Sequence, residues 1–91
     1  MTVVRVRVTV RGRVQGVWYR DTCDRVARSI GVKGWVRNLP DGSVQVVAEG
    51  EREVVDGLLE WCQQGPPQAN VTEIDIVDEQ PTGEREFRIR Y

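Results

Sequence analysis

The stretch VRVRVTVRGRVQGVWYR, from Val4 to Arg20, holds an alternating pattern followed by a loop that contains two glycines. From Val4 to Val10 every second residue is valine, and arginine or threonine stands between the valines. This period of two predicts a strand with one buried face. Gly12 and Gly16 allow the chain to turn after the strand without steric penalty. The stretch therefore predicts a strand that leads through a loop towards a helix near Arg20.

Two helices are predicted from apolar residues that recur at i, i+3, i+4 and i+7. The first runs from Asp21 to Ile30 and ends at Gly31, a residue type that favours helix ends. Its apolar face consists of Cys23, Val26, Ala27 and Ile30. The second runs from about Glu51 to Gln64 and is ended by the sequence GPP. Its apolar face includes Val55, Leu58, Leu59 and Cys62.

Four further segments have the pattern of strands. VKGWVRN (32–38) and SVQVVAEG (43–50) are separated by LPDG, a sequence typical of a tight hairpin turn. VTEIDIVDE (71–79) alternates in the same way, and EFRIRY (86–91) predicts a short final strand with Phe87, Ile89 and Tyr91 on one side.

This order predicts an α+β fold for residues 1–91 as a single domain. Two split βαβ units give a ferredoxin-like two-layer sandwich, βαββαβ with a short final strand. Both helices should cover one face of a mostly antiparallel sheet, and Trp35 should lie on the open face. Arg5, Arg7 and Arg11 should share that face with Glu73 and Asp75. We expect exposed ion pairs between the first and fourth strands, each of little energetic value.

The composition excludes several classes of function. The chain has 91 residues and a formal net charge of −1, whereas nucleic-acid-binding modules usually show a basic excess. It contains no histidine, which removes the commonest general base and metal ligand. No apolar run has membrane-spanning length, and arginines interrupt the N-terminal segment where a signal peptide needs apolar residues. We therefore expect a cytoplasmic protein that binds no metal, membrane or nucleic acid.

The two cysteines are predicted to be buried thiols. Cys23 and Cys62 both fall on core-facing helical stripes, where the two helices should bring them near one another. A disulfide is disfavoured in a reducing compartment. Neither cysteine is followed six residues later by the arginine that a cysteine phosphatase needs, since Ser29 and Gln68 occupy those positions.

The loop GRVQGVWYR has the chemistry of an anion site. Successive N–H groups in a glycine-containing turn can converge on an anion, and the N-terminus of the following helix adds partial positive charge. Arg20 would be repelled by that helix end unless an anion lay between them. A plain connection with Arg20 in solvent is the alternative interpretation, because short glycine motifs often match by chance.

GRVQGVWYR followed by GWVRNLPDGSVQVVAEG resembles the two signature segments of the acylphosphatase family, and the similarity covers nearly the whole chain. The resemblance implies the fold predicted above and hydrolysis of small acyl phosphates to carboxylate and inorganic phosphate, without metal or cofactor. Arg20 would then bind phosphate and Asn38 would position the attacking water. The backbone cradle would consist of Gln15, Gly16, Val17, Trp18, Tyr19 and Arg20. Trp18-Tyr19 departs from the small residue or phenylalanine followed by phenylalanine of many members, which implies a changed rim around the acyl group.

Three alternatives remain open. Asn38 could simply stabilise the LPDG turn, as asparagine often does. An RNA-binding module of the same topology is suggested by KGWVRN, although Arg37 and Asn38 replace the later residues of its signature. A domain that binds an anion without turning it over would share the loop. Nothing in the sequence predicts more than a monomer.

Overall fold

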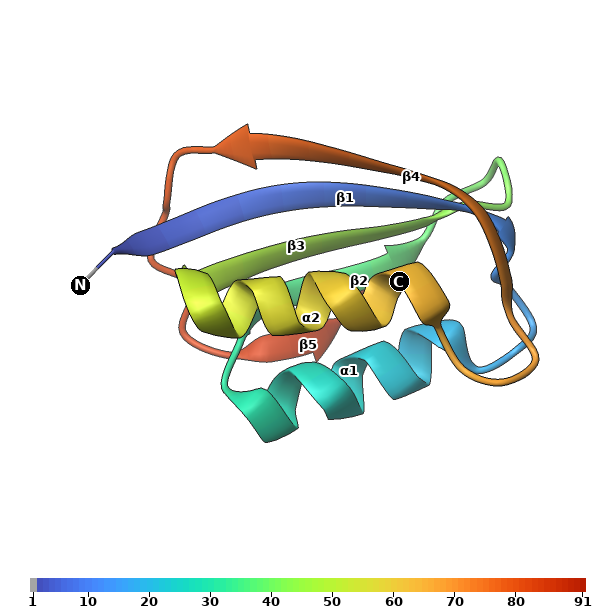
Figure 1. Ribbon diagram of the computed structural model, residues 1–91, viewed down its shortest axis with the longest axis horizontal. Coiled ribbons are helices and arrows are strands. Elements are labelled where there is room, and N and C mark those ends of the chain that lie inside the picture. The colour runs from blue at the N-terminus through green and yellow to red at the C-terminus, as the bar shows by residue number, and fades with distance from the viewer. Residues whose placement is uncertain (1) are drawn as a thin grey trace.

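The computed structural model describes residues 2–91, and its elements follow the predicted order (Figure 1). They are β1 (Val3–Arg13), α1 (Tyr19–Ile30), β2 (Lys33–Asn38), β3 (Val44–Glu51), α2 (Arg52–Gln64), β4 (Asn70–Glu79) and β5 (Phe87–Ile89). Figure 1 shows both helices lying on one side of the sheet. The helices contact one another and the central strands.

The five strands form one sheet in the order β4-β1-β3-β2-β5. All neighbours are antiparallel except β2 and β5, which run parallel. The turn between β2 and β3 is closed by Gly42 N–H, which donates to the carbonyl oxygen of Leu39 at 3.1 Å. The predicted ferredoxin-like α+β sandwich is confirmed.

The core lies between the helices and the inner face of the sheet. The alternating valines of β1 are buried there, and Val8 and Val10 are fully inaccessible to solvent. Burying a valine side chain contributes about 1.5–3 kcal/mol, so this alternation sets which face of β1 turns inward. The helices contribute mainly Cys23, Ala27, Val55, Leu58 and Cys62.

The two cysteines meet in this core, as the helical stripes predicted. Both are free thiols and both are buried. Burial raises the pKa of Cys23, and its hydrogen bond with Cys62 raises it further. Both thiols are therefore packing residues of the core. Within residues 2–91, neither helix is long and apolar enough to cross a membrane.

The predicted ion pairs between β1 and β4 are present on the open face, but Arg5 is not exposed. Arg11 pairs with Asp75 at 2.6 Å in the predicted manner. Arg5, in contrast, is only 8% exposed, because residues 82–84 lie across it. The guanidinium of Arg5 contacts three carboxylates, those of Glu49, Glu79 and Glu84. The prediction that all these arginines face water was wrong at Arg5, since a later segment of the chain covers it.

Glu49 is the buried carboxylate at the centre of this cluster. Its oxygens accept hydrogen bonds from the backbone N–H groups of Thr82, Gly83 and Glu84, at 3.0, 2.7 and 3.0 Å. Burial by itself would raise the pKa of Glu49, but these amides and Arg5 lower it below its ordinary value. The carboxylate thus fastens the segment that leads into β5.

Trp35 covers the open face as predicted, and arginines cover Trp35 in turn. The guanidinium carbons of Arg7, Arg37 and Arg90 lie 5.6, 5.1 and 4.7 Å from the ring centroid. The indole is only 5% exposed. Cation–π contacts of this kind bury the ring without a second layer of helices.

Candidate active site

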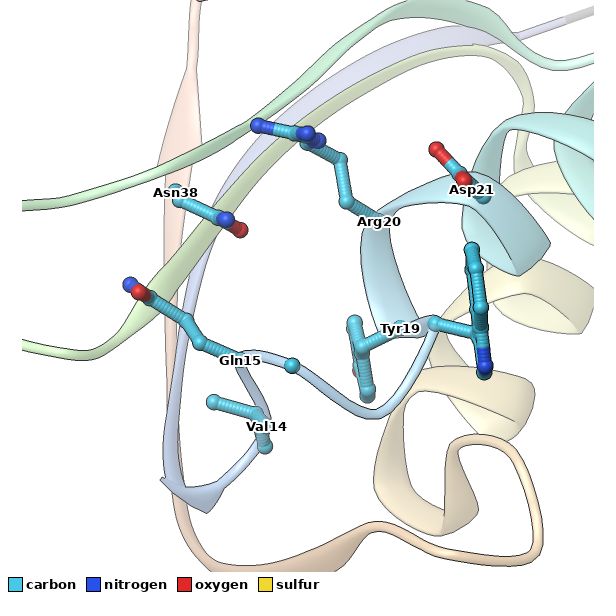
Figure 2. A pocket seen from close by; sticks show the side chains of 8 residues that line it. Val14, Gln15, Tyr19, Arg20, Asp21 and Asn38 are labelled. Atoms are coloured by element: carbon cyan, nitrogen blue, oxygen red, sulfur yellow. The ribbon is translucent and has the colours of Figure 1, made fainter.

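A cavity of about 220 Å³ lies where β1 ends and α1 begins. Figure 2 shows the loop between them along one side, with Arg20 and Asn38 directed into the space beside it. The lining residues are Val14, Gln15, Gly16, Trp18, Tyr19, Arg20, Asp21 and Asn38. The loop that the sequence singled out therefore forms most of one pocket.

The backbone of the loop leaves its N–H groups free for a ligand. Gly16 has φ 75° and Trp18 has φ 69°, so the chain reverses tightly before the helix starts. The first helical hydrogen bond runs from Thr22 N–H to the carbonyl oxygen of Trp18. Within residues 2–91, no N–H group from Gln15 to Arg20 donates to another protein group. Such free amides at a helix N-terminus suit an anion.

Arg20 and Asn38 each bury one polar atom that has no hydrogen-bond partner within residues 2–91. These atoms are Nε of Arg20 and Oδ1 of Asn38. An unsatisfied buried polar group costs about 1–3 kcal/mol, so native proteins rarely retain one without a reason. One atom is a donor and the other an acceptor, and both residues line the same pocket. The pair is suited to a ligand that accepts from the arginine and a water that donates to the asparagine.

Gln15 connects the loop to the β2–β3 hairpin that carries Asn38. Its Nε2 donates to the carbonyl oxygens of Leu39 and Ser43, both at 2.8 Å. These two hydrogen bonds join the loop to the turn that directly follows Asn38. The side chain of Gln15 is thus a brace between the two halves of the site.

Tyr19 and Val17 direct their side chains into the core. The hydroxyl of Tyr19 donates to the carbonyl oxygen of Cys62 at 2.6 Å, and its ring packs against Trp61 at 5.0 Å between centroids. Burial raises the pKa of Tyr19 well above its ordinary value, so the phenol is neutral. Val17 is buried and does not line the pocket. Of the predicted loop residues, these two can contribute backbone groups but no reactive side chain.

Trp18 is the only residue other than glycine with a positive φ within residues 2–91. This left-handed conformation costs about 1–2 kcal/mol for a residue with a Cβ atom. Its side chain makes no capping hydrogen bond to the helix, and the indole is 70% exposed. The fold thus gains little from a tryptophan here.

Sequence reasoning did not place Val14, Asp21 or Tyr91 at the site. Val14 and Asp21 line the pocket directly. The ring of Tyr91 lies 4.7 Å from the guanidinium carbon of Arg20, although the sequence placed it in the apolar row of the last strand. In the structure β5 ends at Ile89, so Tyr91 is free to lie beside Arg20. No local pattern signals this contact, because it joins the start of α1 to the last residue of the sequence.

Fold and pocket together define a class of protein, an α+β sandwich whose strand-to-helix loop presents donors to a small anion. Within residues 2–91, no group of three or more histidine, cysteine, aspartate or glutamate side chains is arranged so that it could hold a metal ion. The pocket offers backbone amides, the guanidinium of Arg20 and the carboxamide of Asn38, and the carboxamide of Gln15 and the carboxylate of Asp21 also belong to residues that line it.

Comparison with known proteins identifies the family. The acylphosphatase family model matches residues 6–89. An acylphosphatase of Methylococcus capsulatus is 59% identical over 80 residues, which cover 88% of this chain and 87% of that protein. An acylphosphatase of Thermococcus kodakarensis is 48% identical over 89 residues, which cover 98% of this chain and 98% of that protein. The solved structure of an acylphosphatase from Coxiella burnetii superposes with a TM-score of 0.92 at 39% identity, over 97% of this chain and 93% of that one. The chain therefore belongs to the acylphosphatase family and is a hydrolase of that type.

Proposed function

We propose that this protein hydrolyses the carboxyl–phosphate anhydride of small acyl phosphates with its own side chains and amides, without a metal ion or cofactor. The products are a carboxylate and inorganic phosphate. The observation that carries the proposal is the buried pair of partnerless atoms, Arg20 Nε and Asn38 Oδ1, in one pocket. The family membership supports the same reaction.

Phosphate binding is assigned to the loop and to Arg20. The amides from Gln15 to Arg20 and the guanidinium donate to the phosphoryl oxygens. Phosphoryl transfer passes through a loose transition state with negative charge on the equatorial oxygens. Donors that are already in position stabilise that charge without reorganisation. Loss of one such donor typically lowers turnover by about 10²–10³-fold.

Asn38 is assigned to the attacking water. Its Oδ1 accepts a hydrogen bond from the water, which orients the water oxygen towards phosphorus, but a carboxamide cannot remove a proton. The new P–O bond forms as the bond to the acyl oxygen breaks, and the carboxylate departs with that electron pair. The proton of the water passes to a phosphate oxygen of the substrate. A carboxylate is a good leaving group, so no general acid is needed.

The direct test is hydrolysis of benzoyl phosphate, followed in the ultraviolet with and without a chelator. We expect turnover that the chelator does not change. Inorganic phosphate binding without turnover would contradict the proposal and favour an anion-sensing domain. Turnover that the chelator abolishes would contradict the assignment to these residues alone.

Two variants separate the assigned roles. Arg20→Gln should abolish phosphate binding and turnover together, whereas Asn38→Ala should keep phosphate binding and lower kcat by about 10²–10³-fold. Arg25→Gln is the matched control, because Arg25 lies exposed on the same helix. Unchanged phosphate binding in Arg20→Gln would remove the loop and Arg20 from the mechanism.

The RNA-binding alternative has little support in the structure. Base stacking needs an accessible aromatic platform on the sheet. Trp35, which would form it, is 5% exposed beneath three arginines. A titration with single-stranded RNA at several salt concentrations should detect no salt-dependent binding.

We also propose that residues 1–91 act as one domain and as a cytoplasmic monomer. The free buried thiols suit a reducing compartment. Sedimentation equilibrium should give the mass of a single chain, and cell fractionation should place the protein with cytoplasmic markers.

A further inference from the structure

Two aromatic side chains among residues 2–91 are strongly exposed; one lines the pocket and the other lies beside Arg20. Trp18 is 70% exposed and lines the pocket. Tyr91 is 94% exposed, and its ring lies 4.7 Å from the guanidinium carbon of Arg20. The other aromatic residues are at least partly buried in the core or beneath arginines. Exposed aromatic area is thus concentrated at the candidate site.

Packing does not account for Trp18. The residue adopts a left-handed backbone conformation that favours glycine, and its side chain neither caps the helix nor enters the core. Strain and exposed apolar surface at the rim of a pocket suggest a role in function. The indole is therefore available for a ligand that enters the pocket.

Tyr91 is held in place by its neighbour and not by its own side chain. Arg90 N–H donates to the carbonyl oxygen of Val36 at 2.8 Å, which extends the pairing of β5 with β2 by one residue. Arg90 also stacks on Trp35. The backbone directly before Tyr91 is thus held in the sheet. The ring of Tyr91 lies beside Arg20, and most of its surface is exposed.

We propose that Trp18 and Tyr91 bind the acyl group and select acyl phosphates whose acyl group is aromatic or otherwise flat and apolar. The inference rests on the proposed function, in which the phosphoryl group occupies the loop. The acyl group then extends from the phosphate past the lining residue Trp18 or past Tyr91, which lies beside Arg20. Flat apolar groups gain aromatic contacts and lose exposed area there, whereas an acetyl group is too small to do so.

Binding of stable phosphonates tests the selectivity without turnover. Isothermal titration calorimetry should show benzylphosphonate binding about 3- to 10-fold more tightly than methylphosphonate. Trp18→Gly and Tyr91→Ala should each reduce that ratio. Trp18→Gly also relieves backbone strain, so its melting temperature should not fall. Trp18→Phe keeps an aromatic ring and should retain most of the ratio.

Kinetics supply the second readout. The ratio of kcat/KM for benzoyl phosphate to that for acetyl phosphate should fall in both variants, mainly through a higher KM for benzoyl phosphate. Val77→Ala is the control, because Val77 is an exposed apolar residue on β4 that does not line the pocket.

The outcomes separate the two proposals. Equal binding of the two phosphonates by the wild-type protein, or ratios that neither variant changes, would overturn the acyl subsite and leave the phosphatase activity standing. Failure to hydrolyse either acyl phosphate would overturn the proposed function, and the phosphonate ratio would still decide whether these rings select an aromatic group.

Discussion

Several residues of the candidate site contribute little to the stability of the fold. Arg20 and Asn38 bury polar atoms without protein partners, and Trp18 adopts a conformation that its side chain disfavours. Gly16 has a positive φ with open space where a Cβ atom would stand. Each feature lowers stability or leaves it unimproved, and all of them surround one pocket. This is the pattern expected where residues are retained for binding and catalysis.

Gly16→Ala tests the loop conformation at the scale of one residue. A Cβ atom meets nothing within 4 Å, so the substitution adds backbone strain without a clash. We expect a loss of about 1 kcal/mol in stability and a larger relative loss in phosphate affinity, because the loop amides shift. Calorimetry with inorganic phosphate measures the affinity.

Gly31→Ala is the matched control for that measurement. Gly31 has φ 88° and equally open surroundings, but it ends α1 at the opposite end from the pocket. Its replacement should lower stability by a similar amount and leave phosphate binding unchanged. Equal affinity losses in the two variants would show that the loop conformation has no special role.

At the scale of elements, the site is assembled from three pieces of chain. The end of β1 leads into the loop, α1 supplies Arg20, and the end of β2 supplies Asn38. Gln15 alone hydrogen-bonds through its side chain from the loop to the hairpin, within residues 2–91. In the proposed mechanism, the relative position of phosphate and water therefore depends on this contact between elements.

Gln15→Ala should loosen that contact. Two carbonyl oxygens lose their side-chain donor, so stability should fall by about 1–2 kcal/mol. KM for an acyl phosphate should rise about fivefold if roughly 1 kcal/mol of loop order is lost. Gln45→Ala is the control, because Gln45 bonds Arg37 on the open face and does not touch the loop. Identical kinetics in the two variants would argue against a bracing role.

At the scale of the whole molecule, a buried charge cluster fastens the C-terminal segment to the sheet. Arg5 and Glu49 lie at its centre, and the amides of residues 82–84 close over the carboxylate. From there the chain runs into β5 and on to Tyr91 beside Arg20. The cluster thus holds in place the segment whose last residue, Tyr91, contacts Arg20.

Stability should depend on the ionisation of Glu49. Folding lowers the pKa of Glu49 below its ordinary value of 4.5, because backbone amides and Arg5 outweigh the effect of burial, so folding favours the ionised form. Its contribution is complete above the pKa of the unfolded chain and is lost as the pH falls through the lower, folded pKa. Glu49→Gln should therefore destabilise by about 1–3 kcal/mol at pH 7, with a smaller difference from wild type below about pH 4.

Urea unfolding at pH 7 and pH 3 measures this difference. Glu73→Gln serves as control, since Glu73 is an exposed acid that lies 3.8 Å from Arg11. It should change the free energy of unfolding little at either pH. A Glu49→Gln destabilisation that is the same at both pH values would assign the effect to packing and not to charge.

Much of this architecture could be predicted because its signals are local. The alternating valines of β1, the i, i+3, i+4 stripe of α1 and the LPDG turn each depend on residues close in sequence. The loop and Arg20 could also be singled out from the sequence, because a positive charge at the N-terminus of a helix is unfavourable unless an anion lies beside it. Arg5 and Tyr91 were misjudged because their partners lie more than 40 residues away.

The sequence by itself determined the order of the elements, the inward face of each and the segment that lines the pocket, since hydrophobic periodicity and turn chemistry act over a few residues. Only the tertiary structure decided that Glu49 would be closed over by residues 82–84, and that Tyr91 would reach Arg20. Such contacts depend on where β5 pairs, and that pairing is settled by the free energy of the whole assembled sheet.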